Sequence, residues 1–308
     1  MASLAPVAAG TRVAGAPEGP PVEPVGRRRR STPYLLLLPG MLWLAVFFAV
    51  PILALASQSL QTRVPGAEIG VYTQTFRWAN YPDALREYLR WFGRSFFYAG
   101  LATVVALLIG YPLAYAIAQK SGRWKNLLLV LVIAPFFTSF ILRTIAWKQV
   151  LADEGPVVRV LKAVHLLGRT DSLTATSVAV VAGLTYNFLP FMTLPLYASL
   201  ERVDPRLIEA AGDLYANGFT AFRRVTLRLS MPGVIAGTLL TFIPAAGDYV
   251  NAALLGTPGT AMIGNVIDSR FFRVVDYPTA AALSFMLMAA ILVLVTVYIR
   301  RAGTEELV

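Results

Sequence analysis

Six long apolar stretches alternate with polar segments along the chain. A helix needs about 20 mostly apolar residues to cross about 30 Å of hydrocarbon. The stretches that meet this length are 34–58, 95–118, 126–150, 172–200, 233–255 and 277–299. The pattern therefore predicts an all-α integral membrane protein with six transmembrane helices, the first at 34–58 and the other five in a core from 95 to 299.

Charged side chains inside these stretches are confined to two of them. Arg143 and Lys148 lie in 126–150 and Asp248 lies in 233–255, whereas the other four stretches contain no Asp, Glu, Lys or Arg. A charge at the bilayer centre costs about 2.5 to 3.5 kcal/mol on insertion scales, so it needs a partner or a function. We expect Lys148 to reach the headgroups with its long side chain, which leaves Arg143 and Asp248 to be explained.

The composition agrees with a membrane protein. Hydrophobic residues make up 56% of the chain, charged residues 14%, and the mean hydropathy is +0.62, all outside the range of soluble proteins. The sequence has no cysteine, which excludes a disulfide framework and a thiolate metal site. It has one histidine, His165. The net charge of +10 flanks apolar stretches, so we expect membrane lipid and not nucleic acid as its partner.

The basic residues also predict the orientation. With six spans, one side carries 15 Lys and Arg and the other carries 10. The side richer in Lys and Arg is cytoplasmic. We therefore expect the tail 1–33, the loop 201–232 and the end 300–308 on the cytoplasmic side of the inner membrane, and the loop 59–94 on the opposite side. The tail is expected to be disordered. A cleaved secretory signal, with the four arginines 27–30 before the apolar run and Ala54-Leu55-Ala56 as its cleavage site, remains an alternative.

The loop 201–232 is the largest cytoplasmic segment between spans and contains two short helical patterns. Asp204-Pro205 is a helix start signal for 206–214, Asn217-Gly218 is a turn signal, and a second helical pattern covers 219–228. A pair of amphipathic helices lying on the headgroups would explain the arginines of this loop. It would not explain the small and acidic start Glu209-Ala210-Ala211.

Glu209-Ala210-Ala211 and the following "FRRVTLRLSMPG" resemble the EAA loop in the membrane subunits of binding-protein-dependent ABC importers. The resemblance covers residues of about 90 to 300. The segments "LRTIAWKQVL" at 142–151, "YNFLPFMTLPLYASLERVD" at 186–204 and "FIPAAGDYVNAALLG" at 242–256 are similar to the branch that imports spermidine and putrescine. The resemblance implies the type I importer fold and a polyamine permease subunit that is not an enzyme by itself.

The family resemblance also implies partners. They are a second permease subunit, two ATPase subunits that hold ATP and Mg, and an extracytoplasmic substrate-binding protein, while this chain binds no cofactor. It has no G-x-x-x-x-G-K-[ST] phosphate loop of its own. In the family the loop is a coupling helix that docks on the ATPase, which implies coupling roles for Glu209, Ala210, Ala211, Gly212, Asp213, Leu214, Asn217 and Gly218.

The sequence departs from the family pattern at two positions of this loop. Tyr215 stands where the family has Gly, and Arg228 stands where it has Pro. Gly serves an elbow because it tolerates positive φ, which a tyrosine adopts only at a cost. We therefore expect the elbow to shift to Asn217 or Gly218.

Two hypotheses compete for Asp248. In the first, it binds an amine of a cationic substrate, and the remaining pathway residues are Tyr249, Asn251, Trp147, Tyr186 and Phe188. In the second, it pairs with Arg143, because both residues would lie about 23 to 25 Å along straight helices from the cytoplasmic ends of their spans.

Other functions were weighed against the polyamine importer. An importer for another small organic solute stays open, since the binding protein usually sets specificity. A secondary transporter is disfavoured by the single acidic residue in the six stretches. Outside the membrane, residues 78–93, "WANYPDALREYLRWFG", predict a short helix at the outer surface, either for contact with the substrate-binding protein or as an interfacial anchor.

Overall fold

The computed structural model describes residues 32–165, 167–168 and 171–302. The expected tail 1–33 lies almost wholly outside this range, as do the arginines 27–30 and the end 303–308. The chain divides into two compact units, Met1–Ile52 and Leu53–Val308, which are described separately.

The first unit contains the beginning of the first apolar helix. α1 (Thr32–Leu44) leads through the π-helical turn η1 (Ala45–Ala49) into α2 (Val50–Ser59), which crosses into the second unit. Pro51 has no N–H to donate to the carbonyl of Phe47, so the chain forms a wider turn just before it, in which the Val50 N–H bonds Ala45. The side chains described in α1 and η1 are exposed, as expected of a helix that is to be covered by lipid or by another helix.

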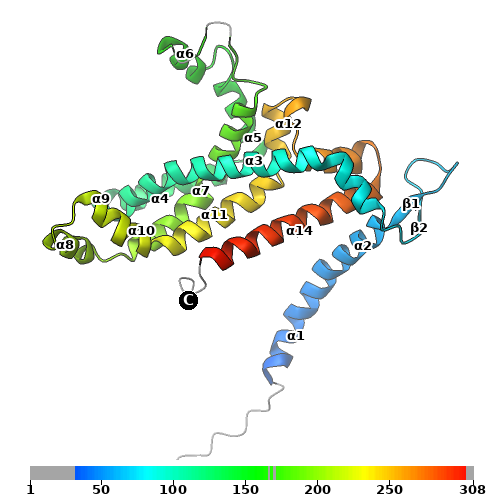
Figure 1. Cartoon of the computed structure of the whole chain (residues 1–308), viewed down its shortest axis with the longest axis horizontal. Coiled ribbons are helices and arrows are strands. Elements are labelled where there is room, and N and C mark those ends of the chain that lie inside the picture. Colours follow the sequence, from blue (N-terminus) through cyan, green and yellow to red (C-terminus); the bar gives the residue numbers. More distant parts are fainter. Residues whose placement is uncertain (1–31, 166, 169–170, 303–308) are drawn as a thin grey trace, which may run out of the picture. The chain divides into compact units, whose positions relative to one another are not determined.

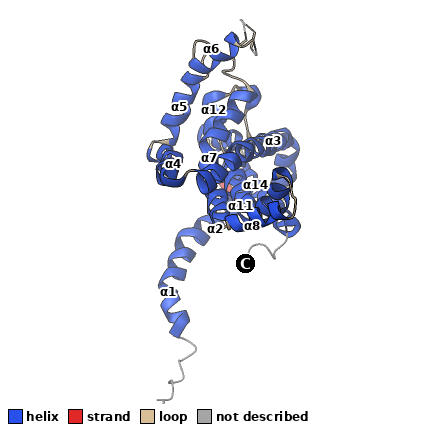
Figure 2. Cartoon of the chain, turned by 90° about the vertical axis from the view of Figure 1, so that its left-hand side faces the viewer, coloured by secondary structure: helices blue, strands red, loops and turns tan. Residues whose placement is uncertain are grey.

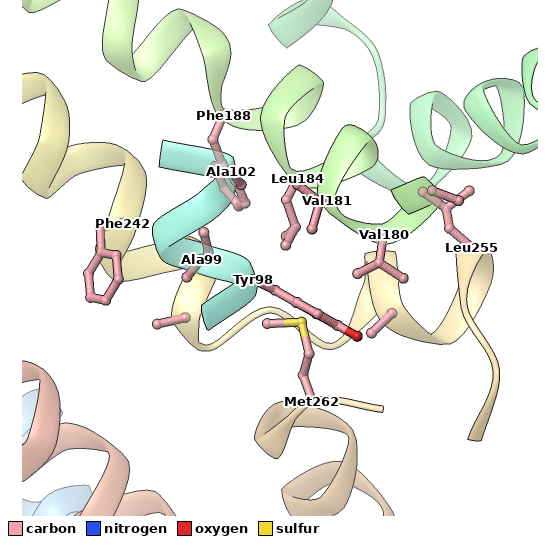
Figure 3. Packing of buried hydrophobic residues seen from close by; sticks show 14 of the residues in the cluster. Tyr98, Ala99, Ala102, Val180, Val181, Leu184, Phe188, Phe242, Leu255 and Met262 are labelled. Carbon is pink, nitrogen blue, oxygen red and sulfur yellow. The ribbon is translucent and has the colours of Figure 1, made fainter. Parts of the chain in front are cut away.

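Four long helices form the bundle of the second unit. They are α3 (Asn80–Tyr115), α7 (Ser177–Glu201), α11 (Met231–Ala246) and α14 (Tyr277–Ala302). α3, α7 and α11 pack against one another, and α14 packs against α3 and α11 (Figure 1). Part of the core is shown in Figure 3, where Ala99 and Ala102 of α3 face Leu184 and Phe188 of α7.

The other elements of the second unit connect these helices. Outside the bundle the strands β1 (Gln61–Arg63) and β2 (Tyr72–Gln74) form an antiparallel hairpin. The connections between the long helices are η2 (Ala116–Lys120), η3 (Gly122–Trp124), α4 (Lys125–Ile133), η4 (Ala134–Phe137), α5 (Phe140–Val150), α6 (Pro156–Ala163), α8 (Pro205–Asp213), α9 (Gly218–Ala221), η5 (Phe222–Thr226), α10 (Leu227–Leu229), α12 (Val250–Leu255), η6 (Pro258–Thr260), α13 (Ile263–Asp268) and η7 (Ser269–Arg273).

The hairpin is tied to the segment before α14. The Tyr72 hydroxyl donates to the Val275 carbonyl at 2.5 Å, and the Tyr72 and Tyr277 rings lie 5.8 Å apart. Burial, followed by the nearby Asp276 carboxylate, raises the pKa of Tyr72. The phenol therefore stays protonated and keeps this donor over the physiological pH range.

Small residues let α7 and α11 approach closely. A Cβ added at Gly233 would lie 2.6 Å from the backbone oxygen of Pro195, and one at Gly237 would lie 2.9 Å from the Met192 sulfur. Helices inside a membrane gain most from such close contact, because lipid tails are as apolar as leucine. The contact of α7 with α11 therefore depends on these two glycines.

The stretch 126–150 does not form the straight helix expected from its composition. α4 ends at Ile133, the 3-10 turn η4 follows, and α5 leaves at an angle of 101° (Figure 2). Pro135 falls in the turn, and Thr138 and Ser139 are extended, with ψ of 151° and 135°. The straight helix assumed for the depth of Arg143 is therefore wrong, because the backbone turns through η4 and the extended residues.

Two further helix boundaries differ from expectation. The stretch 233–255 is broken, since α11 ends at Ala246 and α12 begins at Val250. By contrast, α3 begins at Asn80 and continues without interruption into the second apolar stretch. The helix expected at 78–93 is thus present from Asn80 onward, but as the first turns of α3 and not as a short helix by itself.

The number of spans depends on how the bent helices are counted. In the described chain four helices are long and apolar enough to cross a membrane. Two bent pairs, α4 to α5 at 101° and α9–α10 to α11 at 64°, raise the number to six if each pair is one span. The predicted all-α membrane architecture is confirmed, with bent segments in place of two straight helices.

The contact of α7 with α11 predicts unequal effects of two glycine substitutions. Gly233→Ala should lower the free energy of unfolding by about 1 to 3 kcal/mol, because the new methyl meets the backbone of Pro195. Gly100→Ala is the control, since a Cβ at Gly100 of α3 meets nothing within 4 Å. Thermal denaturation of both variants in detergent checks this, and equal melting temperatures would contradict it.

Candidate functional site

A chain of buried polar side chains links three helices beside the broken segments. Asn187 of α7 donates through Nδ2 to Thr144 Oγ1 of α5 at 3.1 Å and to Asn251 Oδ1 of α12 at 2.9 Å. The residues of this chain, called the amide network below, are all almost fully buried. Asn187 Oδ1 and Asn251 Nδ2 have no partner within the described chain. A buried acceptor and a buried donor are thus left open to a ligand or a water.

Asp248 begins α12. Its Oδ1 accepts the backbone N–H of Asn251 at 2.8 Å, and 8% of the residue is exposed. An acidic side chain in this position satisfies a free N–H at a helix start and is favoured by the helix dipole. Asp248 therefore has a structural role as a cap that neither sequence hypothesis included.

The backbone turn between α11 and α12 is held from the other side by α13. Asn265 Nδ2 donates to the Tyr249 carbonyl at 2.7 Å. Gly264 lies so close that an added Cβ would stand 2.6 Å from the Gly247 carbonyl oxygen. The turn that carries Asp248 is thus fixed by backbone contacts, which orient its carboxylate.

Arg143 does not pair with Asp248. Among the described residues no ion pair joins them, and Asp248 bonds Asn251 instead. The Arg143 guanidinium lies over the rings of Phe136 and Phe140, with centroid distances of 5.3 and 5.7 Å. The matched depths assumed for the ion pair required a straight helix from Asn126, and the 101° bend before α5 removes that basis.

Aromatic side chains stand next to the amide network. Trp147 of α5 and Tyr186 of α7 are stacked, with ring centroids 5.1 Å apart and an angle of 4° between planes. Both line a groove of about 480 Å³ whose other walls are mainly apolar residues of α3 and α7. Phe188 is instead buried in the core (Figure 3), and Tyr249 is half exposed.

The loop 201–232 forms the helical hairpin that its pattern predicts. Asp204 caps α8 by accepting the Arg206 N–H at 2.9 Å, and Asn217 caps α9 by accepting the Thr220 N–H at 2.8 Å. Most side chains of α8 are exposed, including Glu209 and Ala210. A helix with so little of its surface covered by its own chain is available to a partner.

The elbow of this hairpin stays at Tyr215. Tyr215 has φ of +60°, whereas Asn217 has φ of −70° and Gly218 is not among the residues with positive φ. The expected shift of the elbow to Asn217 or Gly218 is wrong. Tyr215 is held by two bonds, from its own N–H to Gly212 and from the Ala216 N–H to Ala211, which together form a helix-ending motif that usually contains glycine.

Residues 106–302 match the family model described as the binding-protein-dependent transport system inner membrane component. The chain belongs to this family. It is therefore a component of an inner membrane transport system that works with a binding protein.

Three relatives illustrate the similarity of this inner membrane component to known proteins. It is 38% identical over 259 residues to the spermidine/putrescine transport system permease protein PotB of Haemophilus influenzae, covering 84% of this chain and 90% of that protein. Identity to PotB of Escherichia coli is 34% over 258 residues, covering 84% and 93%. Identity to the inner membrane ABC transporter permease protein YdcU of Escherichia coli is 31% over 296 residues, covering 89% and 90%.

Two solved structures share the fold. One is a bacterial ABC transporter involved in the import of the acidic polysaccharide alginate, with a TM-score of 0.67, 17% identity and coverage of 87% of this chain and 94% of that one. The other is a bacterial alginate ABC transporter in complex with an alginate pentasaccharide-bound periplasmic protein, with a TM-score of 0.65, 17% identity and coverage of 86% and 92%. The expected type I importer fold is confirmed.

The structure brings some of the expected pathway residues of this inner membrane component together and separates others. Asp248 contacts Asn251, and Trp147 contacts Tyr186, while Arg143 stands apart over its two phenyl rings. Sequence reasoning missed Asn187 and Thr144, because it considered charges within spans and passed over uncharged polar side chains. An asparagine at position 187, inside an apolar stretch, was the available signal.

The cap on α12 predicts different effects for two changes at Asp248. Asp248→Asn should leave stability nearly unchanged, because an asparagine oxygen still accepts the Asn251 N–H. Asp248→Ala removes the acceptor and should cost about 1 kcal/mol. Yield and melting temperature of the purified variants check this, and an equal loss in both would show that charge, not capping, stabilises the site.

Proposed function

We propose that this chain is the permease subunit of an ATP-driven importer that moves polyamines such as spermidine and putrescine into the cytoplasm. The observation that carries the proposal is the 34% and 38% identity to two spermidine/putrescine permeases over at least 90% of their lengths. The fold shared with ABC importers of known structure supports the transport role.

The amide network offers suitable groups for a protonated amine. Asp248 supplies a carboxylate that can accept amine N–H groups, and Asn187 Oδ1 is an acceptor with no partner among the described residues. The stacked pair of Trp147 and Tyr186 borders an apolar groove, and aromatic faces attract ammonium groups while apolar walls suit the methylene chain between them. Asp248 is the only acidic group among these residues, and no basic side chain of the described residues forms an ion pair with it. These groups therefore fit an organic cation better than an anion.

The energy for import is proposed to come from separate subunits. The chain carries no phosphate loop, so ATP and Mg are held by two ATPase subunits that grip α8, and this chain needs no cofactor of its own. A second permease subunit completes the cavity wall, and an extracytoplasmic protein delivers the substrate. The excess of Lys and Arg on one side supports cytoplasmic termini and a cytoplasmic loop 201–232.

Reconstitution tests the function directly. The chain, its second permease subunit and its ATPase subunits are placed in liposomes, the binding protein is added, and uptake of labelled spermidine and putrescine is measured with and without ATP. ATP-dependent uptake is expected. Accumulation by the chain alone without nucleotide would favour a secondary transporter, and uptake of a different solute would retain the importer but reject polyamine.

The charge of Asp248 predicts a specific loss of transport. Asp248→Asn keeps the cap but removes the negative charge that attracts an ammonium group, so the concentration of spermidine for half-maximal uptake should rise at least tenfold, equivalent to about 1.4 kcal/mol. Asp83→Asn is the control, because Asp83 is an exposed residue paired with Arg77 away from the network. Unchanged uptake by Asp248→Asn would reject the role of its charge.

The exposed face of α8 predicts a loss of coupling without loss of folding. Glu209→Lys reverses a charge and Ala210→Arg adds a long side chain where a partner helix must approach closely, so ATP-driven uptake should fall more than tenfold while membrane insertion stays normal. The matched control is Glu68→Lys, which reverses an exposed charge in the loop 59–94. Normal uptake in both α8 variants would contradict docking at this helix.

A further inference from the structure

Tyr215 pays a conformational cost in a position that glycine would fill without one. Tyr215 follows Leu214, the C-cap residue of α8, and has φ of +60°. It is fixed there by two hydrogen bonds, from the Tyr215 N–H to the Gly212 carbonyl at 2.9 Å and from the Ala216 N–H to the Ala211 carbonyl at 3.0 Å. These bonds are made by backbone atoms, so a glycine would make them equally well and with less strain. The elbow itself therefore does not require the side chain of a tyrosine at position 215.

The side chain of Tyr215 is also uncovered. It is 99% exposed, and two other large apolar side chains of the same elbow, Leu214 and Phe219, are 81% and 70% exposed. These three residues are called the elbow residues below. Large apolar side chains gathered on a polar loop are typical of a surface that another molecule covers.

The charges of α8 favour a protein over a membrane surface as that molecule. Residues 204–213, which lead into the elbow, contain the acidic residues Asp204, Glu209 and Asp213 and one basic residue, Arg206, whereas the other arginines of the loop, 202, 223, 224 and 228, lie outside this segment. Anionic headgroups attract basic segments and repel acidic ones. An apolar centre with acidic residues beside it fits a protein pocket whose rim is basic.

We propose that Tyr215 is a specificity residue that inserts into a pocket of the ATP-hydrolysing subunit and determines which ATPase this permease accepts. The inference rests on the proposed function and adds one specific contact between the permease and its ATPase subunit. The backbone bonds hold Tyr215 rigidly in the left-handed region, so the ring is presented to the partner with few rotatable bonds left to order. A rigid tyrosine at the centre of an interface commonly supplies a large share of the affinity.

The test compares the affinity of three forms of the permease for its ATPase subunit. Co-expression of the two subunits first establishes that they form a complex. The subunits are then expressed and purified separately, and the dissociation constant of the complex is measured in detergent for wild type, Tyr215→Phe and Tyr215→Gly. Tyr215→Gly should bind at least tenfold more weakly, and Tyr215→Phe within about threefold of wild type. If Tyr215 served only as a helix cap, glycine would bind equally well or more tightly, and that result would overturn the inference.

Two controls separate the remaining outcomes. Phe76 has φ of +52° and is 66% exposed in the loop before α3, so Phe76→Gly relieves similar strain at a site away from the elbow and should leave the affinity unchanged. Tryptic cleavage of the loop 201–232 in the full-length permease, compared in vesicles of anionic and of zwitterionic lipid, tests the membrane alternative. Slower cleavage in anionic vesicles that Tyr215→Gly abolishes, with unchanged ATPase affinity, would overturn the inference alone, whereas failure of the wild-type permease to bind any ATPase would overturn the proposed function as well.

Discussion

Backbone hydrogen bonding is the constraint on which this structure depends. A peptide group surrounded by hydrocarbon has no water to bond, so a chain can leave the helical conformation there only where other groups replace the lost bonds. At the turn after α11, Asp248 accepts the Asn251 N–H and Asn265 donates to the Tyr249 carbonyl. At the turn after α4, the Thr138 hydroxyl donates to the Pro135 carbonyl at 2.7 Å. The polar side chains near the proposed substrate site are thus required first by the fold.

In the proposed importer, the same residues would serve both stability and transport. Asp248 fixes the start of α12 by accepting the Asn251 N–H, and the amide network ties α12 to α5 and α7 while leaving one donor and one acceptor without a partner among the described residues. The close contact of α7 with α11 at Gly233 and Gly237 keeps the rest of the bundle rigid. Motion applied at the loop 201–232 is then expected to move packed helices as units, because a close-packed interface has few intermediate arrangements.

The sequence was sufficient for the architecture and insufficient for its breaks. Apolar length alone located the long helices, because only helices of that length satisfy their backbone in lipid. The apolar stretches contain eight prolines, and the chain turns sharply around Pro135, while α7 continues through Pro190 and Pro195 and α11 through Pro244. Whether a proline ends a helix depends on the neighbours that support the freed carbonyl, which no local pattern records. Asn187 within an apolar stretch did signal a buried polar group, but its partners Thr144 and Asn251 are far apart from it in sequence and only the structure identifies them.

Four π-helical turns, η1, η2, η5 and η7, have a further consequence for how the chain tolerates change. Each holds one residue more than an α-helical turn without interrupting the helix. In an α-helix one residue corresponds to a rotation of about 100°. The five residues of η5 therefore set the rotation of α9 relative to α10 about their common helix axis. Removing a single residue from η5 would restore the ordinary helical pitch and rotate α9, with α8 before it, about the helix axis. The direction in which the hairpin faces therefore depends on the number of residues in η5 and not on their side chains.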